Sequence, residues 1–170
     1  MFGGGVNRFI QASVGLHIAS LPNQDTDTAG WKHFKVHPSP TMLRSHPTAS
    51  TSRTTPQGLI QLTWVTKDPT GHDTLFLDLT VPLGSSAEVK LPLHVLSSRD
   101  NMSSVQSSVQ VIWGKHCSLT CKVDVPEAIL SHGCPEGLIH EVICINREHD
   151  KELFLLIRSA GPGQHRFRIA

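Results

Sequence analysis

The feature that most constrains the fold is a stretch of alternating apolar and polar residues between positions 58 and 92. Three runs within it have a period of two, which places the apolar side chains of each run on one face of a β-strand. Their apolar members are Ile60, Leu62 and Trp64, then Leu75, Leu77, Leu79 and Val81, then Ala87, Val89 and Leu91. Turn sequences separate the runs, and proline ends two of them. We predict a three-stranded antiparallel meander whose apolar face needs a second layer to cover it.

Similar alternation continues through much of the remaining chain. Further runs occur at residues 31–37, 109–113, 119–125, 139–145, 153–157 and 166–169. Residues 41–56 are rich in Ser, Thr and Pro, and predict either an extended edge strand or a loop. About eight strands at regular spacing favour a mainly β fold, an antiparallel β-sandwich.

Residues 3 to about 20 have a helical period instead. Their apolar residues recur every three to four positions, at Val6, Phe9, Ile10, Val14, Leu16 and Ile18. This pattern predicts one amphipathic N-terminal helix. Gly15 costs about 1 kcal/mol relative to alanine within a helix, and its usual explanation is the close approach of another backbone. Because the chain offers this helix no partner helix, we interpret it as the last helix of a larger helical domain, followed by a polar linker at residues 21–30.

Composition excludes some classes of protein. The net charge is +1 with histidine neutral, without the basic stripe of a nucleic-acid binder. No run reaches the roughly 18 apolar residues of a membrane span. The four cysteines have no zinc-site spacing, so their disulfide state stays open: Cys117, Cys121, Cys134 and Cys144. Asn101 begins a glycosylation sequon, which matters only in a secreted protein.

Few residues are candidates for binding. His33 and His37 could share a face, but two histidines are an incomplete metal site, so we expect no metal and no cofactor. Trp31 begins its strand beside the linker and could contact a sugar or a neighbouring domain. Trp64 and Trp113 follow the apolar alternation, which favours a place in the core.

Several short motifs follow one another in a characteristic order. They are Phe2-Gly3 with Phe9-Ile10 and Gly15-Leu16; Gly30-Trp31-Lys32 to Pro38-Ser39-Pro40; Pro56-Gln57-Gly58-Leu59-Ile60 with Trp64; Val81-Pro82, Gly84 to Ser86, Ala87-Glu88-Val89 and Leu91-Pro92; and Gly161 to Gly163 with Phe167. Their order and spacing, most of all from residue 30 to residue 92, resemble the C-terminal part of bacterial-type α-L-rhamnosidases, an inverting glycoside hydrolase family.

The resemblance implies a division of the chain. Enzymes of this family have an (α/α)6 catalytic barrel followed by a small β-sandwich. Residues 1–20 would then be the terminal helix of a catalytic barrel that is missing here, residues 21–30 a linker, and residues 31–170 the C-terminal sandwich. The implied partners are that barrel and a rhamnose-containing carbohydrate.

Catalytic residues are not expected in this chain. Inverting glycosidases use a carboxylic acid and a carboxylate about 6.5–9.5 Å apart, and in the resembled enzymes both belong to the barrel. The glutamates of the strands and loops match no such position: Glu88, Glu127, Glu136, Glu141, Glu148 and Glu152. We therefore expect a non-catalytic supporting domain that is inactive alone. The alternative is a free-standing carbohydrate-binding or adhesion sandwich, and a third hypothesis is a histidine metal-binding module.

Overall fold

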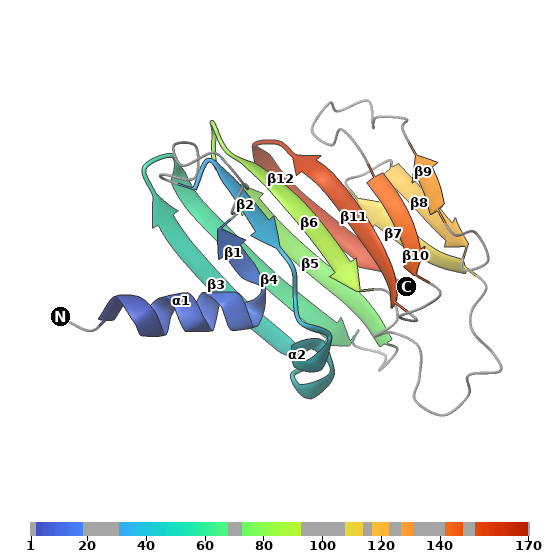
Figure 1. The fold of residues 1–170 in the computed structure, drawn as a ribbon, viewed down its shortest axis with the longest axis horizontal. Helices are drawn as coiled ribbons and strands as arrows, with labels where there is room; N and C mark the ends of the chain where they lie inside the picture. The colour runs from blue at the N-terminus through green and yellow to red at the C-terminus, as the bar shows by residue number, and fades with distance from the viewer. Residues whose placement is uncertain are drawn as a thin grey trace.

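The computed structural model describes residues 3–18, 31–67, 73–92, 108–113, 117–122, 127–130, 142–147 and 152–169. Within these ranges the chain forms two helices and twelve strands (Figure 1). The elements are α1 (Gly3–Val14), β1 (Leu16–Ile18), β2 (His33–Val36), α2 (Pro40–Ser45), β3 (Thr48–Thr55), β4 (Gly58–Lys67), β5 (Asp73–Val81), β6 (Ser86–Pro92), β7 (Ser108–Trp113), β8 (Cys117–Lys122), β9 (Glu127–Leu130), β10 (Val142–Arg147), β11 (Glu152–Ala160) and β12 (Gly163–Ile169).

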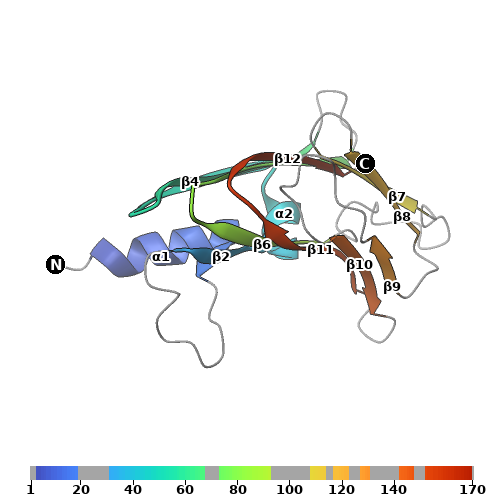
Figure 2. The same ribbon diagram turned by 90° about the horizontal axis from the view of Figure 1, so that it is seen from above.

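The strands form two layers that face each other, as Figure 2 shows. Sheet A has the order β1-β2-β6-β11-β10-β9, and sheet B has the order β3-β4-β5-β12-β7-β8. All described pairs are antiparallel except β2 with β6. The predicted mainly β fold, a β-sandwich after an amphipathic helix, is confirmed. The short strands β1 and β9 and the edge strand β3 raise the number of strands above the expected eight.

The predicted three-stranded meander is wrong at its third strand. β4 and β5 are antiparallel neighbours in sheet B, but β6 crosses to sheet A, where it lies between β2 and β11. The alternating residues of β5 and β6 therefore face each other across the core rather than side by side. A period of two predicts which face of a strand is apolar, and it does not specify the strand's neighbour. Part of the expected second layer is β6 itself.

The N-terminal helix is shorter than predicted. It ends at Val14, and residues 16–18 pair with β2 as a strand, with Leu16 opposite Val36. Gly15 has φ +108°, a conformation open mainly to glycine, and a Cβ there would lie 2.5 Å from the Pro38 nitrogen. The expected close approach of another backbone is thus present. This close approach lies just after the end of the helix, so Gly15 terminates α1 and is not a residue of its interior.

The segment before β4 contains a short helix and an edge strand. α2 has Pro40 in its first turn, where proline's missing N–H costs nothing, and it buries Leu43 in the core. β3 then forms the edge of sheet B, which confirms one of the two expected alternatives. Helix α1 covers this edge in part, because the Gln11 amide nitrogen donates to the carbonyl oxygen of Ser52 at 3.2 Å. Within the described residues no helix is long and apolar enough to cross a membrane.

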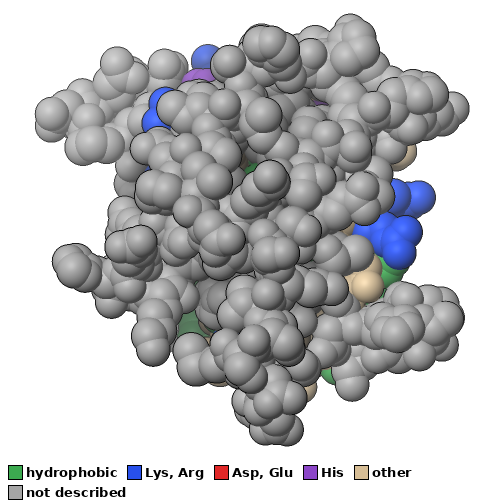
Figure 3. All heavy atoms as spheres, turned by 90° about the vertical axis from the view of Figure 1, so that its right-hand side faces the viewer, with side chains coloured by type: hydrophobic (Ala, Val, Ile, Leu, Met, Phe, Trp, Pro, Cys, Tyr) green, Lys and Arg blue, Asp and Glu red, His purple; other side chains and the backbone are tan. Residues whose placement is uncertain are grey.

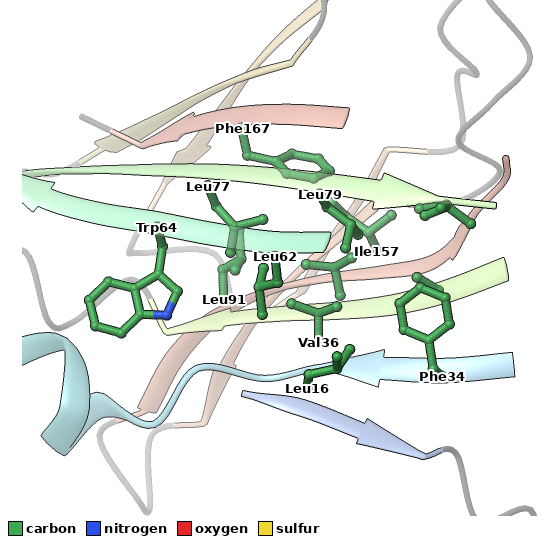
Figure 4. Close-up of a cluster of buried hydrophobic side chains, with 14 of the residues drawn as sticks. Leu16, Phe34, Val36, Leu62, Trp64, Leu77, Leu79, Leu91, Ile157 and Phe167 are labelled. Atoms are coloured by element: carbon green, nitrogen blue, oxygen red, sulfur yellow. The ribbon is translucent and has the colours of Figure 1, made fainter. Parts of the chain in front are cut away.

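The core lies between the two sheets. Side chains of both layers meet there, as Figure 4 shows, and the largest fully buried ones are Trp64, Phe34, Phe167, Leu16, Ile60, Leu62, Leu75, Leu77, Leu79 and Leu91. The indole nitrogen of Trp64 donates to the carbonyl oxygen of Val14 at 3.0 Å, so its polar atom is satisfied. The predicted core position of Trp64 is confirmed. The side chain of Trp113 lies outside the described residues.

Candidate functional site

A polar hollow of about 500 Å³ lies on the outer face of sheet B, the upper surface of the molecule in Figure 2. Its lining residues are Gln61, Thr63, Asp78, Leu79, Thr80, Gln164, His165 and Arg166. Its volume is within the range of about 300–1,000 Å³ that is common for small-molecule sites. The hollow is therefore large enough for a small ligand.

The register of three central strands places the polar side chains in rows. Gln61 of β4, Thr80 of β5 and Gln164 of β12 are direct neighbours. Because the apolar residues of these strands face the core, the polar residues between them face outward together. In the next row along the strands, Thr63 lies opposite Asp78, and Asp78 lies opposite Arg166 on its other side. The hollow thus combines one row of amides and a hydroxyl with one row that carries charge.

The charged row holds a tightly paired but exposed ion pair. The Arg166 Nε donates to Asp78 Oδ1 at 2.6 Å, and its Nη2 donates to Oδ2 at 3.3 Å. These hydrogen bonds and, secondarily, the negative charge of Asp78 raise the pKa of Arg166 above its ordinary value. The two side chains are 76% and 52% exposed, so water screens their attraction. The pair fixes the carboxylate in place more than it stabilises the fold.

The amide row is free for other partners. Among the described side chains, none makes a hydrogen bond to the amide groups of Gln61 and Gln164. A neighbouring hydroxyl pair extends the polar face, because the hydroxyl oxygens of Ser50 and Thr63 are 2.9 Å apart.

Figure 3 shows the end of the molecule that lies at the right in Figure 1. Lysine and arginine side chains of described residues reach the surface there.

The hollow can bind through hydrogen bonds, but it lacks the groups for glycoside hydrolysis. Inverting hydrolysis needs two carboxyl groups on opposite sides of the bond, and Asp78 is the one carboxylate among the lining residues. Within the described part of the chain, no three His, Cys, Asp or Glu side chains are grouped to hold a metal. The expectation that the chain needs no metal or cofactor stays a prediction.

Comparison with known families finds one family model that matches part of this chain. Residues 24–106 match the family model described as Bacterial alpha-L-rhamnosidase C-terminal domain. The match covers a little less than half of the 170 residues. The resemblance predicted from the order of the motifs is confirmed. β4 and β5 lie within the matched residues, and β12 lies beyond them.

Two solved structures are similar to the chain. The α-L-rhamnosidase from Dictyoglumus thermophilum is 15% identical with a TM-score of 0.40, and the match covers 82% of this chain and 11% of that one. The α-L-rhamnosidase from Streptomyces avermitilis, complexed with L-rhamnose, is 16% identical with a TM-score of 0.42, and covers 95% and 10%. The chain therefore spans about one tenth of each enzyme. No curated protein matches it.

Trp31, within the residues that match the family model, lies at the edge of the core. The residue is only 7% exposed, and its backbone has φ +66°. The Arg53 guanidinium lies 5.4 Å from its ring centroid, and the Phe34 ring lies 6.4 Å away at a tilt. Both contacts belong to the chain itself. A contact between Trp31 and a sugar or a neighbouring domain stays a prediction.

The other candidates from the sequence are separate from the hollow. The His33 Nδ1 is 2.6 Å from the Ser86 hydroxyl on the outer face of sheet A. Asn101 and the side chains of the four cysteines lie outside the described residues. Glu88 makes an ion pair with Lys35 at 3.4 Å on the surface. No candidate residue from the sequence is part of the polar hollow.

Sequence reasoning did not single out the hollow, because its residues are the polar members of the alternating runs. Such residues were expected only to face water. Asp78 and Arg166 are 88 positions apart, and only the pairing of β5 with β12 brings them together. The available signal was the repeated polar residue at alternate positions of each strand. It indicates a site only when the pairing register of the strands is known.

Proposed function

We propose that this chain is the non-catalytic C-terminal part of an α-L-rhamnosidase-like glycoside hydrolase, where it supports a catalytic α/α-barrel. The observation that carries the proposal is the family match of residues 24–106. The whole enzyme would release terminal α-L-rhamnose with inversion. The chain alone would not, since the polar hollow has a single carboxylate among its lining residues.

Helix α1 favours a role in holding the barrel, because its two faces differ in exposure. One face packs on the sandwich through Gln11 and Val14, which are 7% and 6% exposed. On the other face, Phe9 is 74% exposed and Ile10 is 50% exposed. Contiguous apolar side chains on a surface indicate contact with another protein surface. We infer that these two side chains contact the neighbouring helices of the barrel.

The gain from covering them is moderate. Full burial of a side chain such as Phe or Ile stabilises by about 1.5–3 kcal/mol. Phe9 and Ile10 together would therefore contribute roughly 2–4 kcal/mol to the contact, since both are already partly covered. This is enough to orient two domains that one chain already joins.

The mass of the native species that carries this sequence tests the proposal first. We expect a species several times larger than 18.6 kDa, because the barrel would be attached. In that species, replacing Phe9 and Ile10 by serine should lower the melting temperature. The same double change in the isolated chain should have little effect, within about 0.5 kcal/mol, since both side chains are exposed there.

Leu83 offers a matched control. It is 81% exposed in the turn between β5 and β6, apart from α1. Leu83→Ser should leave the melting temperature of both species unchanged. A native species of 18.6 kDa, or hydrolysis of an aryl α-L-rhamnoside by the purified isolated chain, would contradict the proposal.

A further inference from the structure

We propose that the polar hollow is a binding site for a neutral saccharide, a role beyond support of a barrel. The hollow is formed by residues on both sides of the boundary of the family match, since Gln164 and Arg166 lie beyond residue 106. It therefore exists only in the folded sandwich, where β12 lies beside β5.

The hydrogen-bonding groups suit sugar hydroxyls. Each hydroxyl is a donor and an acceptor, and each glutamine amide also offers both functions. Gln61 and Gln164 lie in one row with Thr80 between them. Neighbouring strands are about 4.8 Å apart, so the two amides extend from points about 10 Å apart. This spacing allows contact with hydroxyls at opposite ends of a disaccharide.

The charge of the lining favours a neutral ligand. Arg166 already donates two hydrogen bonds to Asp78, and the pair has no net charge. An anion such as a phosphate or a uronate would gain little attraction from Arg166, because the adjacent Asp78 carboxylate offsets its charge and would repel the anion. The Asp78 carboxylate is held in one orientation, and each of its oxygens retains a lone pair for a sugar hydroxyl.

The apolar content of the hollow argues against a peptide. Leu79 is the one apolar residue in its lining, and the Leu79 side chain is buried in the core. No Phe or Trp ring is among the lining residues, and the Phe76 ring on β5 has the Arg168 guanidinium 5.5 Å from its centroid. A peptide would need an apolar anchor, whereas a sugar can be held by the polar rows alone. Without a stacking ring we expect a millimolar dissociation constant.

The strands hold the rows rigidly before a ligand binds. β4, β5 and β12 each have a hydrogen-bonded neighbour on both sides, so all three are central strands. The Asp78 carboxylate is fixed by two hydrogen bonds, and the Thr63 hydroxyl lies 2.9 Å from that of Ser50. Such preorganisation lowers the entropy lost on binding.

The test is a titration of ¹⁵N-labelled protein, followed by NMR through backbone and side-chain amide signals. The neutral probes are maltose and rutinose, a rhamnose-containing disaccharide, and the acidic probe is digalacturonate. We expect saturable shifts of the side-chain amides of Gln61 and Gln164 with a neutral probe. The double change Gln61→Ala and Gln164→Ala should weaken binding roughly tenfold, through the loss of two hydrogen bonds.

Thr54 provides the control. It is an exposed residue of β3 on the same sheet and does not line the hollow. Thr54→Ala should leave the dissociation constant unchanged. Three results would overturn the proposal: no saturable shift with either neutral probe, tighter binding of digalacturonate, or equal binding by the double variant. The supporting role would survive any of them, because native mass and the variants of α1 test it separately.

Discussion

The tight packing of Gly15 at the junction between α1 and β1 can be tested with one substitution. Gly15→Ala would place a methyl group 2.5 Å from the Pro38 nitrogen, 2.6 Å from its Cα and 2.8 Å from the His37 carbonyl carbon. All three are backbone atoms, so no side chain can rotate away. The change also puts alanine at φ +108°, which side chains rarely adopt.

The expected cost follows from these two effects. Holding a residue other than glycine in such a conformation costs about 1–3 kcal/mol. An extra methyl group in a tightly packed place costs about 1–3 kcal/mol more. The total of about 2–6 kcal/mol is a large part of the 5–15 kcal/mol by which native proteins are stable. For a chain of this length it corresponds to roughly 4–24 °C in melting temperature.

The assay is urea and thermal unfolding, with Gly84→Ala as the comparison. Gly84 also has positive φ, +77°, but a Cβ there would have Gln57 Cγ as its nearest neighbour at 4.0 Å. This variant therefore has backbone strain without a clash, and should lose about 1–3 kcal/mol. We expect Gly15→Ala to lose clearly more.

Equal losses in the two variants would refute the reasoning. They would mean that the backbone around Pro38 is not packed as tightly on Gly15 as the structure has it. A Gly15→Ala protein as stable as the unchanged chain would also refute the proposed end of α1, because alanine is a better helix residue than glycine.

Three other substitutions test the core and the hollow. Leu77→Ala should cost about 2–5 kcal/mol in urea unfolding, since the side chain is fully buried; a loss below 1 kcal/mol would contradict its place in the core. Trp64→Phe should cost about 1–3 kcal/mol or more, because it leaves the buried carbonyl of Val14 without its donor; no loss would mean that water replaces the donor. Asp78→Asn should change stability by at most about 1 kcal/mol, less at high salt, because its ion pair with Arg166 is exposed; a larger loss in thermal unfolding would show that the pair is structural.

Local patterns predicted much of the fold. The alternating residues of β4 and β5 are buried as expected, and Trp64 lies fully in the core. The pattern could not place β6 in sheet A, because a strand's neighbour depends on contacts far along the chain. It also missed the end of α1 at Val14, since Leu16 and Ile18 continue the helical period although they belong to a strand.

The candidate site was less predictable than the core. The side chains of the polar hollow come from three strands, and the charged pair spans 88 positions. Polar residues on a strand have the same pattern whether they bind a ligand or only water. The family, in contrast, could be inferred from motif order, because glycine and proline positions report backbone constraints that are local.

The attachment of α1 also determines how the sandwich can be oriented. The helix ends in the core at Val14, whose carbonyl accepts a hydrogen bond from Trp64, and the Gly15 carbonyl accepts one from the His37 nitrogen at 2.7 Å. With Gln11 bound to β3, the helix touches both sheets. A body that binds the exposed side of α1 would therefore hold the sheets at a fixed angle and could not swivel freely around them.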